Sequence, residues 1–170
     1  MQYNDILTRK NRNFFQKGTD FMTVKKTKRA AAFAELTLLN RNHTEYPDSP
    51  DQARIETFQN ADAQRDYVIE FDCPEFTSLC PVTGQPDFGH IRIRYVPDQR
   101  CIESKALKLY LFSYRNFNTF HESAVNRILT DLAAACAPRW MEVRGDFMPR
   151  GGIAIHVRAE EGDSSLRPAE

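Results

Sequence analysis

The sequence predicts an α+β protein in which an antiparallel sheet carries two helices on one face. Three observations support this prediction. Apolar and polar residues alternate at 67–72 and again at 91–95, as in two half-buried strands. The apolar spacing becomes helical between residues 103 and 136, and alternation returns after Pro138. The predicted element order is therefore β-β-α-α-β-β, with an antiparallel hairpin at each end.

Residues 1–30 are polar and show no sustained hydrophobic periodicity. Residues 1–30 carry eight basic and two acidic side chains, which predicts a flexible basic arm. Residues 41–64 are polar and contain two prolines, so we expect a long connection or lid. A single catalytic domain is then expected over 31–160, followed by a flexible C-terminal tail at 161–170.

The first two predicted strands are separated by a segment rich in residues that break regular structure. In the first strand Tyr67, Ile69 and Phe71 share one face. The segment 73–89, CPEFTSLCPVTGQPDFG, contains three prolines and two glycines. This composition disfavours both helix and strand, and we expect an ordered loop here.

Two helices and a second hairpin follow. The apolar stripes of the helices are Leu107, Tyr110, Leu111 and Tyr114, then Val125, Ile128, Leu129, Leu132 and Cys136. Alternation over 140–147 and 153–158 flanks the turn sequence MPRGG and predicts the last two strands. A four-stranded sheet leaves two exposed edges, which neighbouring subunits commonly cover, so we expect a symmetric oligomer.

Composition limits the kinds of partner that the protein can have. The chain has 170 residues, 41% hydrophobic and 27% charged, and a formal net charge of zero. This balance suits one soluble domain and argues against a general nucleic-acid binder. Neither a long apolar run nor an apolar leader is visible in the sequence. We therefore expect a cytoplasmic protein without a membrane partner.

The four cysteines stand apart, and their closest spacing is C-x6-C, which fits neither a zinc ribbon nor a C-x-x-C motif. Isolated cysteines in an intracellular chain are mostly small buried hydrophobes. Cys80 differs, because it lies in the breaker-rich segment, where a loop can present a thiol nucleophile. Asp87 follows in the same segment, with an Asx turn after Pro86 as its alternative role.

Two further groups are candidate binding residues. His121 and Glu122 precede the second apolar stripe; Glu122 either interacts with the helix dipole or offers two acceptor oxygens to adjacent N–H donors of a guanine-type ring. Lys105 and Lys108 follow Ser104 at the start of the first helix. They form either a solvated face or an anion-binding patch.

Three stretches, FTSLCPVTGQPDFGHI, IESKALKLYLFSYRNFNTFHE and MPRGGI, together resemble the 7-cyano-7-deazaguanine reductases, the NADPH-dependent nitrile reductases of queuosine biosynthesis. The resemblance covers about residues 55–158 and is to the short, one-domain form. It implies the tunnelling fold (T-fold) shared with GTP cyclohydrolase I, in which subunits join their sheets into barrels. The short form is typically a decamer of two facing pentamers, and its small-molecule substrate is a 7-deazapurine.

The resemblance also implies roles for individual residues. Cys80 matches the nucleophile that forms a covalent thioimide with the nitrile carbon, and Asp87 matches the proton donor. Five positions match substrate contacts: Ile102, Glu103, Ser104, His121 and Glu122. Lys105 and Lys108 match positions expected to meet the phosphates of NADPH. No resident metal is expected.

Two other functions are compatible with parts of the sequence. A GTP cyclohydrolase-like hydrolase needs a zinc site, but Cys80 and His90 alone leave the ligand set incomplete, and Cys101 has no nearby histidine. A non-catalytic structural or RNA-binding module would use the basic arm at 1–30.

Overall fold

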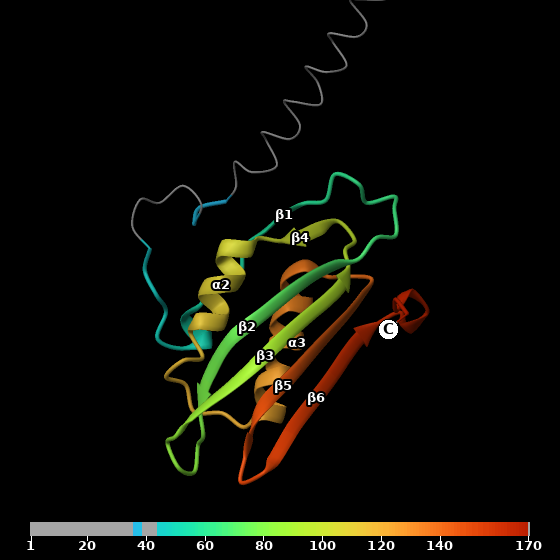
Figure 1. Ribbon diagram of the computed structural model, residues 1–170. Helices are drawn as coiled ribbons and strands as arrows, with labels where there is room; N and C mark the ends of the chain where they lie inside the picture. The colour runs from blue at the N-terminus through green and yellow to red at the C-terminus, as the bar shows by residue number, and fades with distance from the viewer. Residues whose placement is uncertain (1–35, 39–43, 170) are drawn as a thin grey trace, which may run out of the picture. The chain divides into compact units, whose positions relative to one another are not determined.

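A computed structural model describes residues 36–38 and 44–169 of the chain (Figure 1). The chain divides into two units, Met1–Glu35 and Leu36–Glu170, and all of the described residues belong to the second. The basic arm predicted at 1–30 lies outside the described residues.

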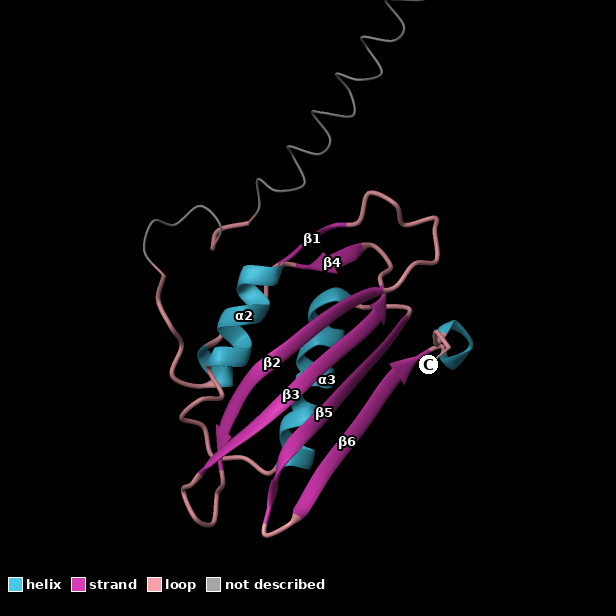
Figure 2. Cartoon of the chain, viewed as in Figure 1, coloured by secondary structure: helices cyan, strands magenta, loops and turns pink. Residues whose placement is uncertain are grey.

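The second unit contains an antiparallel four-stranded sheet and two α-helices, which confirms the predicted α+β class (Figure 2). The sheet order is β2-β3-β5-β6. Its strands are β2 (Ile69–Leu79), β3 (Pro86–Val96), β5 (Trp140–Arg150) and β6 (Ile153–Gly162). The helices α2 (Ser104–Phe112) and α3 (His121–Cys136) connect the two hairpins, in the predicted order.

The prediction of a loop over 73–89 was wrong for most of its length. Strand β2 continues to Leu79 and β3 begins at Pro86, so only residues 80–85 form the connection. Pro74 is tolerated because it lies at a register shift between Cys73 and Phe76, on an edge strand of the sheet. Pro86 is tolerated because it is the first residue of its strand.

A second, two-stranded sheet was also missed. Strand β1 (Thr57–Gln59) pairs antiparallel with β4 (Arg100–Ile102), and a short 3-10 helix, η1, spans Pro50–Gln52. The segment 41–64, expected to be a connection or lid, therefore contains regular structure. Each of these strands has three residues, which is too short to produce a recognisable alternation.

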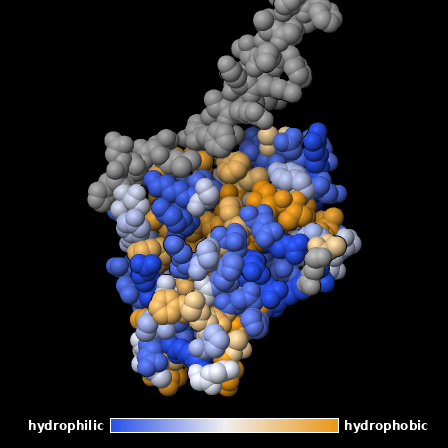
Figure 3. Space-filling view, in the orientation of Figure 1, coloured by the Kyte–Doolittle hydropathy of each residue, from blue (hydrophilic) through white to orange (hydrophobic). Residues whose placement is uncertain are grey.

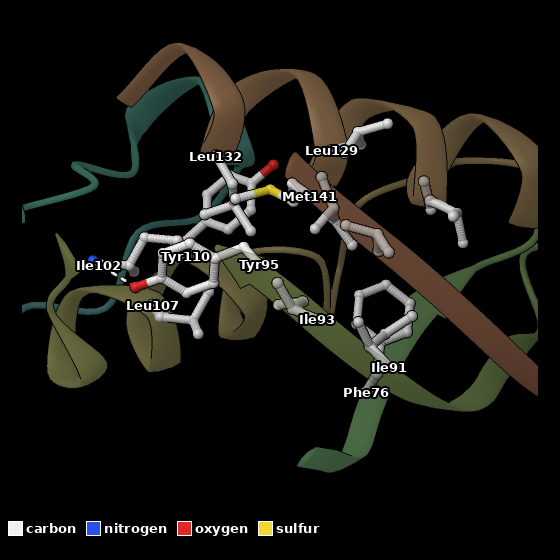
Figure 4. Close-up of a cluster of buried hydrophobic side chains, with 14 of the residues drawn as sticks. Phe76, Ile91, Ile93, Tyr95, Ile102, Leu107, Tyr110, Leu129, Leu132 and Met141 are labelled. Atoms are coloured by element: carbon white, nitrogen blue, oxygen red, sulfur yellow. Dashed lines mark hydrogen bonds between the residues drawn. The ribbon is translucent and has the colours of Figure 1, made fainter. Parts of the chain in front are cut away.

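Both helices pack on the same face of the large sheet. The predicted stripe of α3 is buried, as are Leu107 and Tyr110 of α2, and they share one core with inward-facing side chains of β2, β3 and β5. Figure 4 shows Tyr95 in this core, where its hydroxyl accepts a 3.0 Å hydrogen bond from the Ile102 N–H. This contact fixes the start of α2 at the Tyr95 end of the sheet.

The opposite face of the sheet is charged. Arg92 and Arg144 both pair with Asp146, and Arg158 pairs with Glu142 on the neighbouring strand. Hydrophilic side chains accordingly cover the middle of this face in Figure 3.

Strand β6 ends at Gly162, and a short 3-10 helix, η2 (Ser164–Leu166), follows it. Among the described residues, no helix is long and apolar enough to cross a membrane.

Candidate active site

Cys80 begins the six-residue turn between β2 and β3 and is half-buried. Its N–H donates to the Gln85 carbonyl at 2.9 Å, and its own carbonyl accepts from the Gly84 N–H at 2.9 Å. Hydrogen bonds from the Thr83 hydroxyl, the Thr83 and Val82 N–H groups and Arg150 stabilise the thiolate and lower the pKa of Cys80 from 9.0 to about 7.

The other cysteines have the opposite environment. Burial, together with the nearby Asp72, raises the pKa of Cys73 to about 11, and burial also raises the pKa of Cys101. Burial and Cys101 raise the pKa of Cys136 to about 12. Among the four thiols, Cys80 alone is therefore ionised to a substantial fraction near neutral pH.

Asp87 lies on β3 directly opposite Ser78 of β2, on the side of the sheet that faces the helices. Its side chain is only 6% exposed. One carboxylate oxygen, Oδ1, lies 3.3 Å from His121 Nε2 and 2.8 Å from Arg150 Nε. The role of an Asx turn, left open by the sequence, does not account for these two long-range contacts.

The start of α3 lies at the same end of the sheet. The Leu79 N–H donates to the Phe117 carbonyl, and the Thr119 N–H donates to the Leu79 carbonyl, so the segment before α3 runs beside Cys80. The His121 ring stacks on Phe147 with the ring centres 3.9 Å apart. His121 Nε2 is buried without a hydrogen-bond partner, and the next residue, Glu122, is exposed. This end of the sheet thus combines a thiol, a carboxylate, an imidazole and an exposed carboxylate.

Ile102, Glu103 and Ser104 lie elsewhere. Ile102 is bonded to Tyr95, and Tyr95 stands eight positions along β3 from Asp87, about 25 Å at the usual rise per strand residue. Glu103 is buried and caps α2, because its carboxylate accepts hydrogen bonds from the N–H groups of Lys105 and Ala106. Within one chain Ile102 is therefore distant from Cys80, and Glu103 and Ser104 follow it at the start of α2.

The two lysines predicted to bind phosphate face different cavities. Lys108 lines a cavity of about 540 Å³ between α2 and β2, together with Ser104, Tyr46, Phe112 and Arg115. Lys105 instead lines a smaller cavity of about 300 Å³, and its Nζ donates to the Leu38 carbonyl at 2.5 Å. The structure does not bring the two ammonium groups together.

Arg150 and Thr83 are parts of this site that the sequence analysis did not single out. Arg150 belongs to the MPRGG segment and Thr83 to CPVTG, both of which contributed to the family resemblance. The signal was therefore present in the motifs, but only the structure directs both side chains to Cys80. The described residues contain no group of three or more His, Cys, Asp or Glu side chains that could hold a metal ion.

Both the sequence and the fold of the chain resemble those of QueF-like proteins. A family model described as "QueF-like protein" matches residues 86–165. The archaeosine synthase QueF-Like in its apo form superposes with a TM-score of 0.53 at 23% identity, over 56% of this chain and 94% of that chain. At this identity the likeness shows the fold alone.

The chain belongs to the family of NADPH-dependent 7-cyano-7-deazaguanine reductases. The relative of that name from Streptococcus thermophilus (strain ATCC BAA-491 / LMD-9) is 57% identical over 120 residues, which are 71% of this chain and 74% of the relative. The one from Neisseria meningitidis serogroup B (strain ATCC BAA-335 / MC58) is 53% identical over 127 residues, 75% of this chain and 81% of the relative.

Proposed function

We propose that this protein reduces the nitrile of 7-cyano-7-deazaguanine to the aminomethyl group of 7-aminomethyl-7-deazaguanine, a step of queuosine biosynthesis. The protein is an oxidoreductase that uses NADPH, as its family membership establishes. The observation that carries the proposed mechanism is a thiol with a lowered pKa at the same end of the sheet as a buried carboxylate.

Cys80 acts as the nucleophile. A nitrile accepts hydride poorly, and addition of the Cys80 thiolate converts it into a thioimide with a more electrophilic carbon. Because the pKa of Cys80 is about 7, about half of the thiol is ionised at neutral pH. Loops between rigid strands are suited to presenting such a group to a ligand.

Asp87 supplies the proton that the nitrile nitrogen needs as the carbon–sulfur bond forms, which avoids a free nitrogen anion. Its contacts with His121 and Arg150 fix the orientation of the carboxyl group. NADPH, when bound, would supply the two hydrides that reduction of the nitrile to the aminomethyl group requires; Cys80 leaves as a thiolate between the two hydride additions, and a second proton completes the amine. His121 and Glu122 hold the deazaguanine ring, Glu122 through its two acceptor oxygens.

The cavity between α2 and β2 has a composition that fits NADPH. Lys108 and Arg115 provide cationic groups for phosphates, and the rings of Tyr46 and Phe112 provide flat apolar surface. Lys108 would hold a phosphate group here, with Arg115 as its partner. Lys105 does not face this cavity, since its Nζ is bonded to Leu38. We therefore assign phosphate binding to Lys108 first.

A second copy of the chain is needed to complete the proposed site. Ile102 is bonded to Tyr95, about 25 Å from Asp87 along β3, which is too far for both to contact the same small molecule within one chain; Glu103 and Ser104 follow Ile102 at the start of α2. Strands β2 and β6 are both edges of the large sheet. Pairing these edges between copies would give the barrel of the T-fold and would satisfy their free backbone groups.

The proposed reaction can be tested with the purified full chain. NADPH oxidation, followed by absorbance, should depend on added 7-cyano-7-deazaguanine. Intact-protein mass spectrometry without NADPH should show a covalent gain of one substrate mass in wild type and in Cys73→Ala, but not in Cys80→Ala. An active Cys80→Ala variant, or a wild type that forms no adduct, would contradict the thioimide mechanism.

Sharing of the site between copies has a separate test. Cys80→Ala and Ser104→Asp each remove one half of the proposed site, so each alone should be inactive. If the halves come from different copies, unfolding and refolding the two variants as an equal mixture should restore about one quarter of wild-type activity. Absence of any recovery in a mixture of confirmed oligomers would show that both halves belong to one chain.

A further inference from the structure

Arg150 reaches the candidate site because of a β-bulge. Residues 141, 143, 145 and 147 of β5 face the core, so an even-numbered residue would normally face the charged side of the sheet. The pairing with β6 shifts by one residue between Phe147 and Arg150. This shift turns Arg150 to the side on which Asp87 lies, which is a common use of bulges next to functional sites.

The Arg150 guanidinium connects the two acidic groups of the proposed reaction. Its Nε lies 2.8 Å from Asp87 Oδ1, and its Nη2 donates to the Pro86 carbonyl at 2.8 Å. It is also among the groups that lower the pKa of Cys80, after Thr83 and Val82. The other groups that face this pair are His121, 3.3 Å from the same Asp87 oxygen, and Thr83, at the sulfur.

The proposed reaction requires one particular proton count, and this part of the argument rests on the proposed function. With both Cys80 and Asp87 protonated, no thiolate is present to attack. With both ionised, no proton is available for the nitrile nitrogen, and two negative charges stand together. With one proton between them, the pair carries a single negative charge, which the fixed positive charge of Arg150 neutralises.

We propose that Arg150 is a positioning residue that holds the Asp87 carboxyl group beside the Cys80 thiol, in the arrangement that this step requires. On addition of the nitrile, the bond from the Cys80 sulfur to the nitrile carbon forms and one π bond of the C≡N group breaks. The proton moves from Asp87 to the nitrogen. The product is a neutral thioimide and an ionised Asp87 that remains paired with Arg150, so atoms and charges balance without another reactant.

Alkylation of Cys80 by iodoacetamide tests this role in the full chain without substrate or cofactor. The rate at the Cys80 peptide is measured by mass spectrometry as a function of pH for wild type, Arg150→Met and Arg150→Lys. Arg144→Met is a matched control, because Arg144 lies on the same strand and binds Asp146 through its Nε at 3.1 Å, on the opposite face.

Arg150→Met should slow alkylation at least about threefold below neutral pH. It should also move the midpoint of the pH dependence to higher pH. Arg150→Lys should recover part of the loss, and Arg144→Met should match wild type. An unchanged midpoint in Arg150→Met overturns the proposal, even if the KM for NADPH rises, since that result would assign Arg150 to cofactor binding. A shifted midpoint in a protein that forms no nitrile adduct would retain the Arg150–Cys80 contact and reject the proposed function.

Discussion

Thr83→Val should reduce the reactivity of Cys80 without disturbing the fold. The Thr83 hydroxyl is the largest contributor to the lowered pKa of Cys80, followed by the Thr83 N–H, which the substitution keeps. Thr83 is exposed in the turn after β2, and valine preserves its branched shape. The change therefore removes the hydroxyl that lowers the pKa of Cys80, together with a 3.4 Å hydrogen bond that this hydroxyl accepts from the Gln85 N–H.

The size of the effect follows from the difference between the ordinary pKa of a cysteine, 9.0, and the pKa of Cys80, about 7. If the hydroxyl accounts for about half of that difference, the pKa of Cys80 rises to about 8 in Thr83→Val. The thiolate fraction at neutral pH then falls from about one half to about one tenth, so alkylation slows about fivefold. Thr83→Ser keeps the hydroxyl and should resemble wild type.

The assay is the pH dependence of alkylation at the Cys80 peptide, with thermal unfolding as the check on the fold. A Thr83→Val midpoint equal to that of wild type would refute the account, because the largest single contribution to the thiolate environment would then lie elsewhere. A midpoint that moves together with a large loss of thermal stability would indicate a rearranged turn instead.

Four further substitutions test other parts of the structure. Asp87→Asn should still bind substrate but turn over about 10²-fold more slowly, because an amide cannot supply the carboxylic proton; an equal loss of affinity, measured by calorimetry, would contradict this role. Glu122→Gln should weaken substrate binding about 10- to 100-fold with an unchanged unfolding midpoint, since its side chain is exposed; the reverse pattern would favour the helix-dipole role. Gly145→Ala should cost about 1–3 kcal/mol in denaturant unfolding, because an added Cβ would lie 2.8 Å from the Phe147 ring. Burial raises the pKa of Glu56, but hydrogen bonds from residues 37 and 38 outweigh it and hold this pKa below 4.5, so the stabilisation is present above the unfolded-state pKa and is lost as pH falls through the folded-state pKa. Glu56→Gln should therefore be less stable than wild type at neutral pH, and urea titrations should show the difference shrinking in acid; a constant difference would argue against ionisation as the cause.

Local sequence determined the regular elements well. The alternating residues Ile91, Ile93 and Tyr95 and the apolar stripe of α3 are buried. They could be predicted because the spacing of buried residues along a strand or helix is visible in consecutive residues of the sequence. The motif around Cys80 also provided a candidate nucleophile, and that role stays a prediction. These features depend on neighbours within a few residues.

Contacts between residues far apart in the sequence were decided by the tertiary structure alone. One-residue register shifts in β2 and β5 set which side chains face Asp87, and no local period reveals such shifts, because the pairing partner lies elsewhere in the chain. The same reason explains the missed pairing of β1 with β4 and the contact of Lys105 with Leu38. The sequence by itself thus determined which residues are buried and which motif carries the thiol, whereas long-range pairing placed Arg150 beside it and Ile102 far from it.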